Sequence, residues 1–390
     1  MENKIKAEII THSKRRSTGE EIITYKLTFP RIILSEVNTY KMMEKNTSSS
    51  RAIPFEKMVE VVEKEPFILI AWQLSHKGMQ GTEYLTDERF IEHKKDAWLE
   101  ARDWAVEAAK TLVGNIRYPK YDEVVFNEVG LEEVLNTSLS KNYGNRLLEP
   151  FMWTTQLITG TRESFEHLFE QRCPIYSVEN LKFNSKKEAI ELHPHLKDMT
   201  DLEWLQCNSG QAEIHFMDLA EKMYDALNES TPKELYSEEW HIPFREEILK
   251  DKELKDIEDL VDLIKMSVCL TAKVSYTKIG DENSITIEKA REMYERLKNS
   301  QHWSCFGHIG RCMTDEEYEN WLKGKVKGYY STNIEKQKTV DIDGKLFLHG
   351  VNRDLVKPYF DLKDKGWNKH LKGFISLRQY VEDGVELKDA

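Results

Sequence analysis

Hydrophobic and polar positions alternate in two stretches near the start of the sequence. Residues 4–11 and 21–29 both place apolar side chains at every second position, which predicts two β-strands with one face on a core. The polar residues 15–20 between them are typical of a turn. Pro30 should end the second strand, because proline donates no hydrogen bond to a sheet. A β-hairpin is therefore predicted here.

Apolar positions three and four residues apart predict helices in much of the remainder. The pattern is clearest over residues 89–113, where Phe90, Trp98 and Trp104 recur on one face. The other predicted helices are residues 31–43, 55–63, 131–137, 146–159, 163–171, 211–228, 253–265 and 287–297. Residues 45–51 form a polar interruption, 185–207 are polar and irregular, 266–276 suit either a strand or a helix, and 335–349 suit a hairpin. The predicted fold is α/β in the α+β sense, rich in helix around a modest central sheet.

Composition narrows the class of protein. Of 390 residues, 56 are Lys or Arg and 68 are Asp or Glu, so the net charge is −12. Such a chain is poorly suited to broad non-specific binding of nucleic acid, although a small basic pocket for one phosphate is compatible with it. No run approaches the roughly 20 apolar residues of a membrane span, and five scattered cysteines suggest no disulfide framework. We expect a cytoplasmic protein without nucleic-acid or membrane partners.

Hydroxyl and arginine side chains gather in residues 46–54. Consecutive serines beside Arg51 suit a phosphate site, since hydroxyl groups and a guanidinium both donate to phosphate oxygens. The same pattern occurs in ordinary polar loops that cap a following helix. Arg146 and Arg172 likewise suit either an anion site or the surface of an amphipathic helix. The residues alone leave both readings open.

Residue types that bind zinc occur in two places, but their spacing matches no zinc motif. Residues 302–312 contain His and Cys pairs, and His193 and His195 flank a proline. No metal site is predicted. Glycine-rich phosphate loops and the serine-nucleophile elbow are absent from the sequence. Cys173 and Cys305 have no activating pattern beside them, so neither is a strong candidate nucleophile.

Several segments together resemble the flavin-dependent thymidylate synthase (ThyX) family. The family signature R-H-R-x-x-S-x-N-x-x-S-x-R aligns with residues 39–51, whose second half matches well. Residue Arg172 stands at the position of the family's substrate arginine. Other similar segments are residues 65–72, 78–81, 146–150 and 210–214.

Two further similar segments come later in the chain than the family order would place them. Residues 271–276 resemble A-A-R-V-S-[YF] and residues 302–308 resemble H-x-[ST]-P-F-E-H, both of which normally precede the signature. This is the order of a circular permutation, which requires the joined ends to meet in space. We expect a single catalytic domain over residues 1–310, with an insertion at about 173–209 and a linker at about 230–250, followed by an extension over 311–390.

The resemblance implies a homotetramer whose active sites are shared between subunits. It implies methylation of dUMP to dTMP, with methylenetetrahydrofolate as carbon donor and with FAD, reduced by NADPH, as hydride source. Transfer of a hydroxymethyl group to dUMP at the same site is one alternative. A nucleotide-binding homologue without catalysis is the other.

The resemblance also implies roles for individual residues. Arg172 would be the catalytic residue, lying against the uracil and stabilising negative charge at N3 so that C5 becomes nucleophilic without a cysteine. Ser49, Ser50 and Arg51 would hold the phosphate, with Arg146 reaching in from a neighbouring subunit. The other residues expected at dUMP are Glu36, Asn38, Thr39 and Ser48. Those expected at FAD are Thr39, Tyr40, Lys41, Thr47, His167, His302 and Ser304.

Several positions depart from the family pattern. The R-H-R triplet that contacts FAD is Thr, Tyr and Lys at residues 39–41, so two positive charges become one. Glu44 occupies a position where the family has serine, Gly307 one where it has glutamate, and Gln171 one where it usually has leucine. The arginines on the substrate side are kept better than those on the flavin side. The sequence therefore supports nucleotide binding more strongly than FAD binding.

Overall fold

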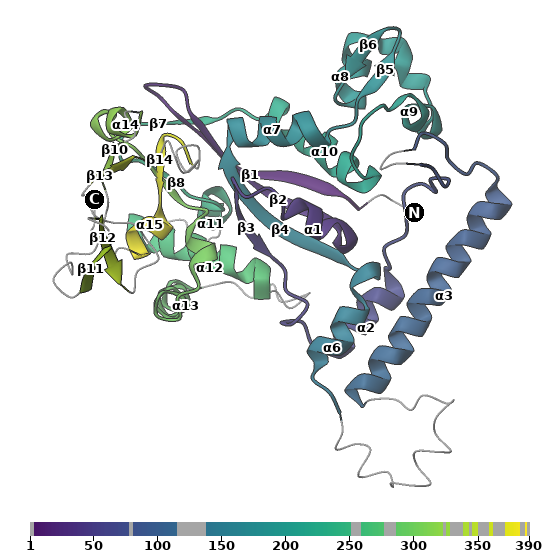
Figure 1. Ribbon diagram of the computed structural model, residues 1–390, viewed down its shortest axis with the longest axis horizontal. Coiled ribbons are helices and arrows are strands. Elements are labelled where there is room, and N and C mark those ends of the chain that lie inside the picture. Colours follow the sequence, from purple (N-terminus) through teal and green to yellow (C-terminus); the bar gives the residue numbers. More distant parts are fainter. Residues whose placement is uncertain are drawn as a thin grey trace.

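The structure is a computed structural model. It describes residues 4–77, 81–114, 138–250, 259–276, 286–322, 325–327, 338–342, 345–349, 359–361, 371–382 and 387. A five-stranded sheet lies at its centre, with helices on both faces (Figure 1). The architecture is α+β, as predicted.

The described elements have the following bounds. The strands are β1 (Lys6–Arg15), β2 (Glu21–Pro30), β3 (Glu44–Thr47), β4 (Trp153–Thr161), β5 (Tyr176–Val178), β6 (Leu181–Phe183), β7 (Lys233–Leu235), β8 (Trp240–His241), β9 (Gly310–Cys312), β10 (Lys325–Lys327), β11 (Lys338–Ile342), β12 (Lys345–His349), β13 (Tyr359–Asp361) and β14 (Phe374–Ser376). The α-helices are α1 (Leu34–Val37), α2 (Phe55–Lys64), α3 (Glu88–Val113), α6 (Lys141–Leu147), α7 (Arg162–Arg172), α8 (Lys186–Leu192), α9 (Asp201–Cys207), α10 (Ile214–Glu229), α11 (Arg245–Lys250), α12 (Leu260–Tyr276), α13 (Ile287–Asn299), α14 (Asp315–Leu322) and α15 (Leu377–Glu382). Short 3-10 helices are η1 (Arg31–Ile33), η2 (Glu149–Phe151), η3 (Pro194–Asp198) and η4 (Trp303–Phe306).

The central sheet has the strand order β3-β4-β2-β1-β7. β1 and β2 form the predicted antiparallel hairpin, with Lys6 opposite Thr28 and Lys14 opposite Glu21. β1 continues to Arg15, past its predicted end at residue 11. β7 pairs with β1 in parallel, and β3 lies at the opposite edge, where it pairs with β4. The exposed side of β3 is therefore where other elements can meet the sheet.

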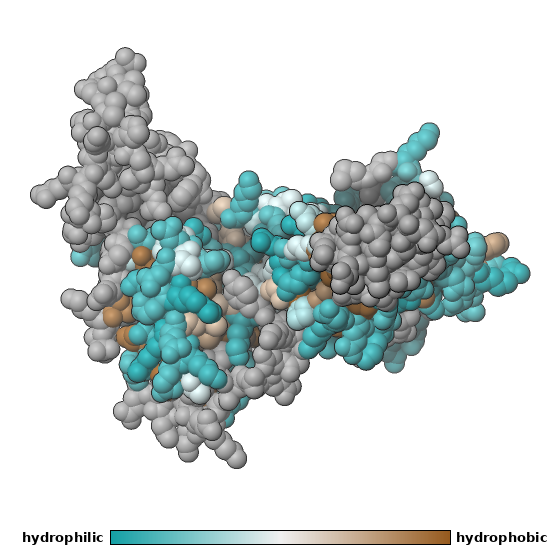
Figure 2. All heavy atoms as spheres, turned by 90° about the horizontal axis from the view of Figure 1, so that it is seen from below, coloured by the Kyte–Doolittle hydropathy of each residue, from teal (hydrophilic) through white to brown (hydrophobic). Residues whose placement is uncertain are grey.

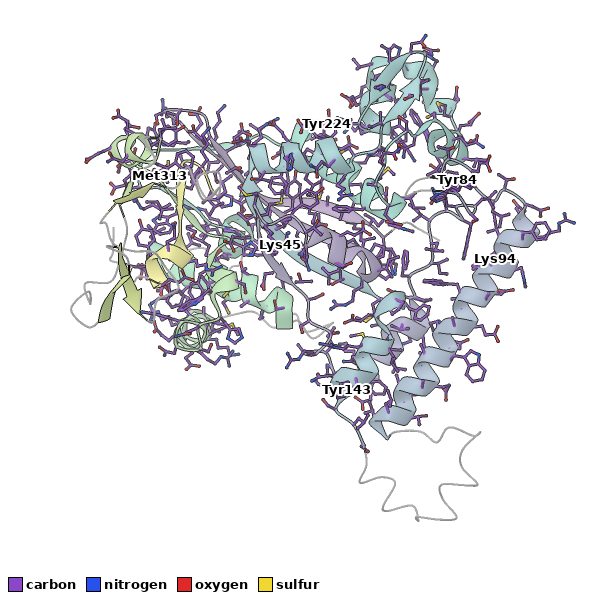
Figure 3. The ribbon with its side chains drawn as sticks, in the orientation of Figure 1. Lys45, Tyr84, Lys94, Tyr143, Tyr224 and Met313 are labelled. Carbon is purple, nitrogen blue, oxygen red and sulfur yellow. The ribbon has the colours of Figure 1, made fainter. Side chains whose placement is uncertain are left out.

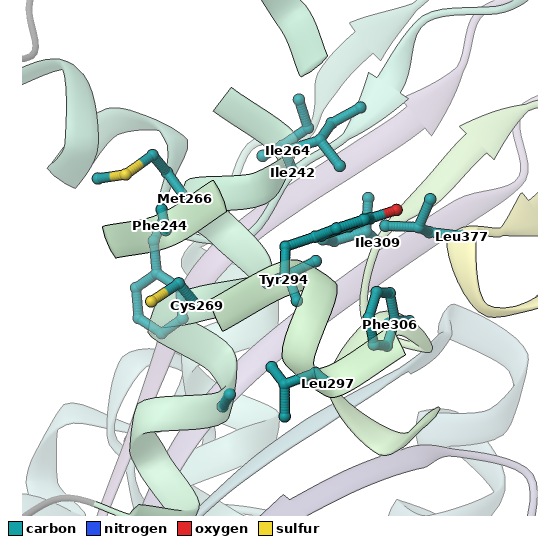
Figure 4. Packing of buried hydrophobic residues seen from close by; sticks show 14 of the residues in the cluster. Ile242, Phe244, Ile264, Met266, Cys269, Tyr294, Leu297, Phe306, Ile309 and Leu377 are labelled. Atoms are coloured by element: carbon teal, nitrogen blue, oxygen red, sulfur yellow. The ribbon is translucent and has the colours of Figure 1, made fainter. Parts of the chain in front are cut away.

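Each face of the sheet has its own hydrophobic core. On one face, Tyr25 of β2 meets Phe165 of α7 edge to face, with 4.9 Å between the ring centroids. The other face is covered by α12, α13 and α15, where Tyr294, Leu297 and Phe306 pack together (Figure 4). Burial of apolar area on both faces, at about 25 cal/mol per Å², is the main force that fixes β3 and β4 between these layers.

The predicted helix over residues 146–159 is wrong. α6 ends at Leu147, η2 follows, and β4 then crosses the middle of the sheet. Leu157 belongs to the core on one face and Ile158 to the core on the other. A strand that is buried on both faces shows no alternation of apolar and polar residues, so the sequence of β4 lacks the two-residue pattern that predicts a strand.

Several other segments also differ from the prediction or decide between its alternatives. Residues 31–43 form only η1 and the single turn α1, and part of the predicted polar interruption forms β3. Residues 266–276, which suited a strand or a helix, are helical within α12. The predicted hairpin near residue 343 is confirmed by antiparallel pairing of β11 with β12. The helix predicted at 131–137 and the first part of that at 253–265 lie outside the described residues.

Residues 185–207 are not irregular. α8, η3 and α9 pack with the hairpin of β5 and β6 around Trp204, which is 3% exposed. This small unit lies at the top of the view in Figure 1, beside α10. It occupies most of the expected insertion and has its own hydrophobic core.

α2, α3 and α6 form a lobe at one side of the sheet (Figure 1). The predicted apolar face of α3 is only partly covered: Ala109 is buried, whereas Phe90 is 55% and Trp104 57% exposed. Tyr143 on α6, labelled in Figure 3, is also exposed. On the side shown in Figure 2, hydrophobic residues lie among mostly hydrophilic ones. None of the described helices is long and apolar enough to cross a membrane.

The C-terminal strand and helix join the body of the molecule. Ser376 of β14 pairs with Gly310 of β9, and the backbone N–H of Leu377 donates to the carbonyl of Ile309 at 2.8 Å. α15 then packs against η4. Residues 374–382 therefore support the same segment that supplies part of the candidate site.

Candidate functional site

A cavity of about 610 Å³ lies beside the edge strand β3. Its wall combines the segment after β3, the start of α6, and parts of α12, α13 and η4. Cavities of about 300–1,000 Å³ commonly hold small molecules. The polar lining residues are Asn46, Ser49, Arg51, Ser140, Lys141, Asn142, Ser275, His302 and Ser304. The cavity is large enough for a nucleotide.

Asn46 joins the segments that form this wall. Its Nδ2 donates to the carbonyl of Thr271, and its Oδ1 accepts from Ser275 Oγ at 2.6 Å and from Ser304 Oγ at 3.4 Å. The side chain is 6% exposed. Three segments that each resemble a motif of one family, and that lie far apart in the sequence, therefore meet at one buried amide.

The loop that follows β3 is held by residues outside it. Arg31 Nη1 donates to the carbonyl of Ser48 at 3.1 Å, and Arg31 Nε lies 3.1 Å from Glu149 Oε1. Asn145 Nδ2 donates to the carbonyl of Ser50 at 2.6 Å. Neither role was predicted from the sequence: Asn145 lies 95 positions from Ser50, and Arg31 lies only 17 positions from Ser48 but outside any recognised motif. They fix the loop in the shape that lines the cavity.

The three serines of this loop have different surroundings. Ser48 Oγ lies 2.8 Å from Thr154 Oγ1, and Ser50 Oγ donates to a carboxylate oxygen of Glu149 at 2.8 Å. Both hydroxyls are thus bonded within the chain. Ser49 lines the cavity, and among the described residues its hydroxyl has no hydrogen-bond partner. Ser49 is therefore the serine best placed to donate to a ligand.

The lining of the cavity is basic. It includes Arg51, Lys141 and His302, and no Asp or Glu among the described residues lines it. In a chain with a net charge of −12, this gathers positive charge at one place and favours an anionic ligand. Burial raises the pKa of the Cys305 thiol to about 12. This lining cysteine therefore stays protonated near neutral pH and is a poor nucleophile.

Two departures from the family pattern face each other in space. A Cβ added to Gly307 would lie 2.5 Å from the carboxyl carbon and Oε2 of Glu44. Glu44 Oε2 also lies 3.8 Å from Nη1 of Arg378, which comes from α15. In the family pattern, a glutamate at the position of Gly307 would bring a carboxyl group to this space. In this chain Glu44 of β3 brings one there instead.

A chain of buried hydrogen bonds crosses the sheet next to this wall. It runs from Ser13 through His241, Thr24 and Thr159 to His308, with successive distances of 2.9, 2.9, 2.7 and 2.8 Å. All five side chains belong to residues that are at most 2% exposed. Burial lowers the pKa of His241 to about 3 and that of His308 to about 4. Both imidazoles are therefore neutral near pH 7 and satisfy polar groups inside the core.

Arg172 lies at the end of α7 and is not among the residues that line the cavity. Its Nε donates to the hydroxyl oxygen of Tyr40 at 2.6 Å. Thr39 Oγ1 donates to the carbonyl of Glu36 at 2.6 Å. Burial, together with the nearby Glu213 carboxylate, raises the pKa of Glu36, while Arg172 lowers it. The predicted uracil-side residues thus form a second cluster, around Tyr40.

The remaining predicted residues lie on several surfaces. Gln156 Nε2 donates to Asn38 Oδ1 at 3.1 Å and to Thr47 Oγ1 at 2.6 Å, which ties α1 to β3. Arg146 on α6 and His167 on α7 are exposed and do not line the cavity. The predicted site residues that do line it are Ser49, Arg51, His302 and Ser304.

His215, a residue the sequence analysis missed, joins two of the motif-like segments. Its Nε2 accepts from the backbone N–H of Ile70 at 3.1 Å, and its Nδ1 bonds the carboxylate of Glu213. Glu213 also caps α10 by accepting from the backbone N–H of His215 at 2.8 Å. A single histidine at a helix start gives no signal in sequence for such a distant partner.

The candidate zinc ligands of residues 302–312 do not form a metal site. Among the described residues, no group of three or more His, Cys, Asp and Glu side chains is placed to hold a metal ion. His302 is exposed, whereas His308 is buried. In the insertion, His195 Nε2 lies 3.1 Å from Glu179 Oε1.

Comparisons with known proteins give a distant resemblance in structure. No protein-family model matches the chain, and no curated protein matches its sequence. Two structures of the UMP/dUMP methylase PolB from Streptomyces cacaoi are similar to it, one bound with 5-Br UMP and one with 5-Br dUMP. The first is 11% identical over 58% of this chain and 89% of that chain, with a TM-score of 0.33. The second is 8% identical over 58% and 90%, with a TM-score of 0.34.

Proposed function

We propose that this chain is an enzyme that binds dUMP and methylates C5 of its uracil, a thymidylate synthase of the flavin-dependent type. The observation that carries the proposal is the junction at Asn46. There the segments that resemble three motifs of that family meet, although the family order places two of them elsewhere. The junction forms the wall of a cavity with a basic lining.

The basic lining suits the phosphate of the nucleotide. Arg51 donates through a planar guanidinium that matches two phosphate oxygens, and Ser49 adds a short hydroxyl donor. Lys141 contributes a second cation from the start of α6. Charge-assisted hydrogen bonds of this kind fix the phosphate and so orient the attached base.

Arg172 is the proposed catalytic residue at the base. A guanidinium against the pyrimidine stabilises the negative charge that develops at N3 and the carbonyl oxygens when C5 attacks a carbon donor. This role needs no thiol, in agreement with the raised pKa of the lining Cys305. Neither Arg172 nor Arg146 lines the cavity of its own chain, so we propose that copies of the chain share sites in a homotetramer.

Exposed aromatic side chains support association between copies. Phe90, Trp104 and Tyr143 are each more than half exposed, and all three come from the lobe of α2, α3 and α6 that also carries Arg146. Aromatic side chains are enriched at the surfaces through which proteins associate. A shared interface at this lobe would bring Arg146 to a neighbouring site.

The proposed cofactor is FAD, with NADPH and methylenetetrahydrofolate as co-substrates. A flavin would supply the redox chemistry. Residues 39–41, however, do not fit a flavin diphosphate as the family triplet does. The hydroxyl of Thr39 is bonded to a carbonyl, and that of Tyr40 is bonded to Arg172 and Gln171, so only Lys41 offers a charge. This misfit favours a second candidate, a dUMP-binding homologue without flavin chemistry.

One set of measurements on the full-length chain tests the proposal. We expect dUMP to bind in a calorimetric titration, and added FAD to give the visible absorbance of a bound flavin. With labelled methylenetetrahydrofolate and NADPH, the expected product is dTMP. Hydroxymethyl-dUMP as product would identify the hydroxymethylase alternative instead. Binding of dUMP without bound flavin or turnover would identify the second candidate, and absence of dUMP binding would overturn the proposal.

A double substitution separates the enzyme from the second candidate. Tyr40→His together with Lys41→Arg restores the imidazole and one of the two guanidinium groups of the family triplet. If the triplet weakens FAD binding in the wild type, this variant should bind FAD more tightly. Equal FAD affinity in both proteins would show that the triplet does not control flavin binding here.

A further inference from the structure

Tyr40 and Arg172 form a direct contact between two parts of the candidate site. Tyr40 follows α1, and its hydroxyl accepts a hydrogen bond from Arg172 Nε at 2.6 Å. The same hydroxyl donates to Gln171 Oε1 at 3.1 Å. The backbone carbonyl of Tyr40 in turn accepts from Lys45 Nζ. Tyr40 is thus held at both ends and holds the guanidinium by one nitrogen.

Two aromatic rings restrict the same guanidinium. Its central carbon lies 5.6 Å from the centroid of the Tyr40 ring and 5.4 Å from that of Phe216. The two rings meet edge to face, with 6.1 Å between their centroids, and Phe216 is fully buried at the start of α10. Cation–π contacts at this distance hold the guanidinium against the two rings and limit its rotation.

The terminal nitrogens of Arg172 are not used within the described chain. No carboxylate of a described residue lies within ion-pair distance of Arg172, and the hydrogen bond from Nε is the one that its side chain makes to these residues. Arg172 lowers the pKa of Glu36 from a distance, but Glu36 and Arg172 form no ion pair. Nη1 and Nη2 are therefore left to donate to a ligand.

We propose that Tyr40 is a positioning residue that fixes Arg172 through Nε, so that Nη1 and Nη2 present two parallel donors to a pyrimidine ionised at N3. A neutral uracil carries a hydrogen on N3, which would oppose a donor. Its N3 anion instead offers adjacent acceptors at N3 and a carbonyl oxygen, which match a two-donor edge. This inference rests on the proposed function, and it assigns to Tyr40 a role in selecting the ionised form of the base.

The ionisation of a bound substrate analogue tests this role directly. The probe is 5-fluoro-dUMP, whose fluorine makes N3 acidic enough to titrate near neutral pH with a change in ultraviolet absorbance. Its N3 pKa is measured free in solution and bound to the wild type, Tyr40→Phe, Arg172→Lys and the double variant. Tyr224→Phe is the matched control, because its hydroxyl bonds Glu188 at 3.1 Å on another helix. Circular dichroism and thermal unfolding confirm that each variant is folded.

The expected result is an N3 pKa that is lower in the wild-type complex than in free solution. Tyr40→Phe should raise the bound value by about 0.5–1 unit, the size of one ordinary net hydrogen bond, because Tyr40 acts on the base only through Arg172. Tyr224→Phe should leave it unchanged. In the Arg172→Lys background, which keeps the charge but loses the planar pair of donors, Tyr40→Phe should have no further effect.

Each other outcome counts against a defined part of the argument. An unchanged N3 pKa in a folded Tyr40→Phe variant would overturn the positioning role while leaving dUMP binding intact. A bound pKa that does not respond to Arg172→Lys would place Arg172 away from the base and overturn the inference. Failure of 5-fluoro-dUMP to bind the wild type would overturn both the inference and the proposed function.

Discussion

The carboxyl group of Glu44 occupies the space that a side chain on Gly307 would need. A Cβ at residue 307 would lie 2.5 Å from Glu44 Oε2, closer than packed atoms approach. We expect Gly307→Ala to lower the free energy of unfolding by about 1 kcal/mol, because the added methyl group must displace the flexible Glu44 side chain but no backbone atom. Urea denaturation of the variant beside the wild type measures the change.

Exchange of the two side chains tests whether they substitute for each other. Gly307→Glu alone should destabilise the chain more than Gly307→Ala does. Combined with Glu44→Ser, which empties the space, it should recover at least about 1 kcal/mol relative to the sum of the single changes. A double-mutant cycle by denaturation gives this coupling energy, and purely additive effects would contradict the contact.

Asn46→Ala should disturb both stability and binding. The substitution removes hydrogen bonds to two serines and leaves the carbonyl of Thr271 without its donor, at a cost of about 2–3 kcal/mol. Because the bonds join the walls of the cavity, dUMP affinity should fall as well. Asn228→Ala, at an exposed position of α10, is the control for denaturation and calorimetry. Equal stability of the two variants would show that the hydrogen bonds of Asn46 do not hold the cavity wall together.

Arg51→Ala should mainly weaken substrate binding. Loss of a charge-assisted contact to phosphate should cost about 1.5–3 kcal/mol of binding free energy, with little effect on the folded state because Arg51 is exposed. Calorimetry with dUMP and with deoxyuridine, which lacks the phosphate, separates the two ends of the ligand. The variant should lose affinity for dUMP alone, and Arg89→Ala on α3 should lose none. An equal loss of affinity for deoxyuridine would show that Arg51 does not contact the phosphate.

Arg172→Ala should affect turnover more than binding. Removal of the group that stabilises charge on the base should lower kcat by about 100-fold or more, while the phosphate contacts keep KM for dUMP within a small factor. Steady-state assays with dUMP varied give both constants. Arg16→Ala, in the β1–β2 turn, serves as the control. If KM rises and kcat is unchanged, Arg172 has a binding role instead.

Acid should destabilise the chain through its two buried imidazoles. Burial lowers the pKa of His241 to about 3 and that of His308 to about 4, from 6.5. The unfolded chain therefore binds protons at these sites first. The stability from each neutral imidazole is complete above about pH 6.5. It is lost as the pH falls toward the folded-state pKa, about 4 for His308 and about 3 for His241, at up to about 1.4 kcal/mol per pH unit.

His308→Asn tests this pH dependence. Asparagine can keep a hydrogen bond to Thr159 but does not titrate. Denaturation at pH 7.5 and pH 5 should show a smaller loss of stability in this variant than in the wild type. The exposed His195→Asn should lose as much as the wild type. An equal pH dependence in all three proteins would show that His308 does not contribute.

The sequence predicted the elements in which apolar residues are concentrated on one face. Alternation over β1 and β2 was visible because the second face of each strand carries mostly polar residues, even where, as at Thr24, that face is buried. Helical spacing over α3, α7 and α13 was visible because one face of each helix meets water. β4 was missed because Leu157 and Ile158 are buried on opposite faces of the sheet. Local patterns carry no trace of such two-sided burial.

The candidate site was only partly predictable for a related reason. Motif resemblance pointed to Ser49, Arg51 and His302, which the structure places at one cavity. It gave no sign that Asn46 joins the segments, or that Tyr40 bonds Arg172, because each contact links residues more than 100 positions apart. A single sequence shows which side chains are present, whereas their pairing depends on the folded chain.

The hydrogen bonds of Asn46 affect how the chain folds while it is being synthesised. Its partner Ser304 lies 258 residues further along the sequence. At synthesis rates of roughly 5–20 residues per second, β3 waits roughly 10 to 50 s on the ribosome before that partner emerges. Once β4 has paired with it, β3 is the edge of the sheet and stays open to pairing with other chains until its later partners are made. We therefore expect slow folding and a need for chaperones, because the segments that form the site lie far apart in the sequence.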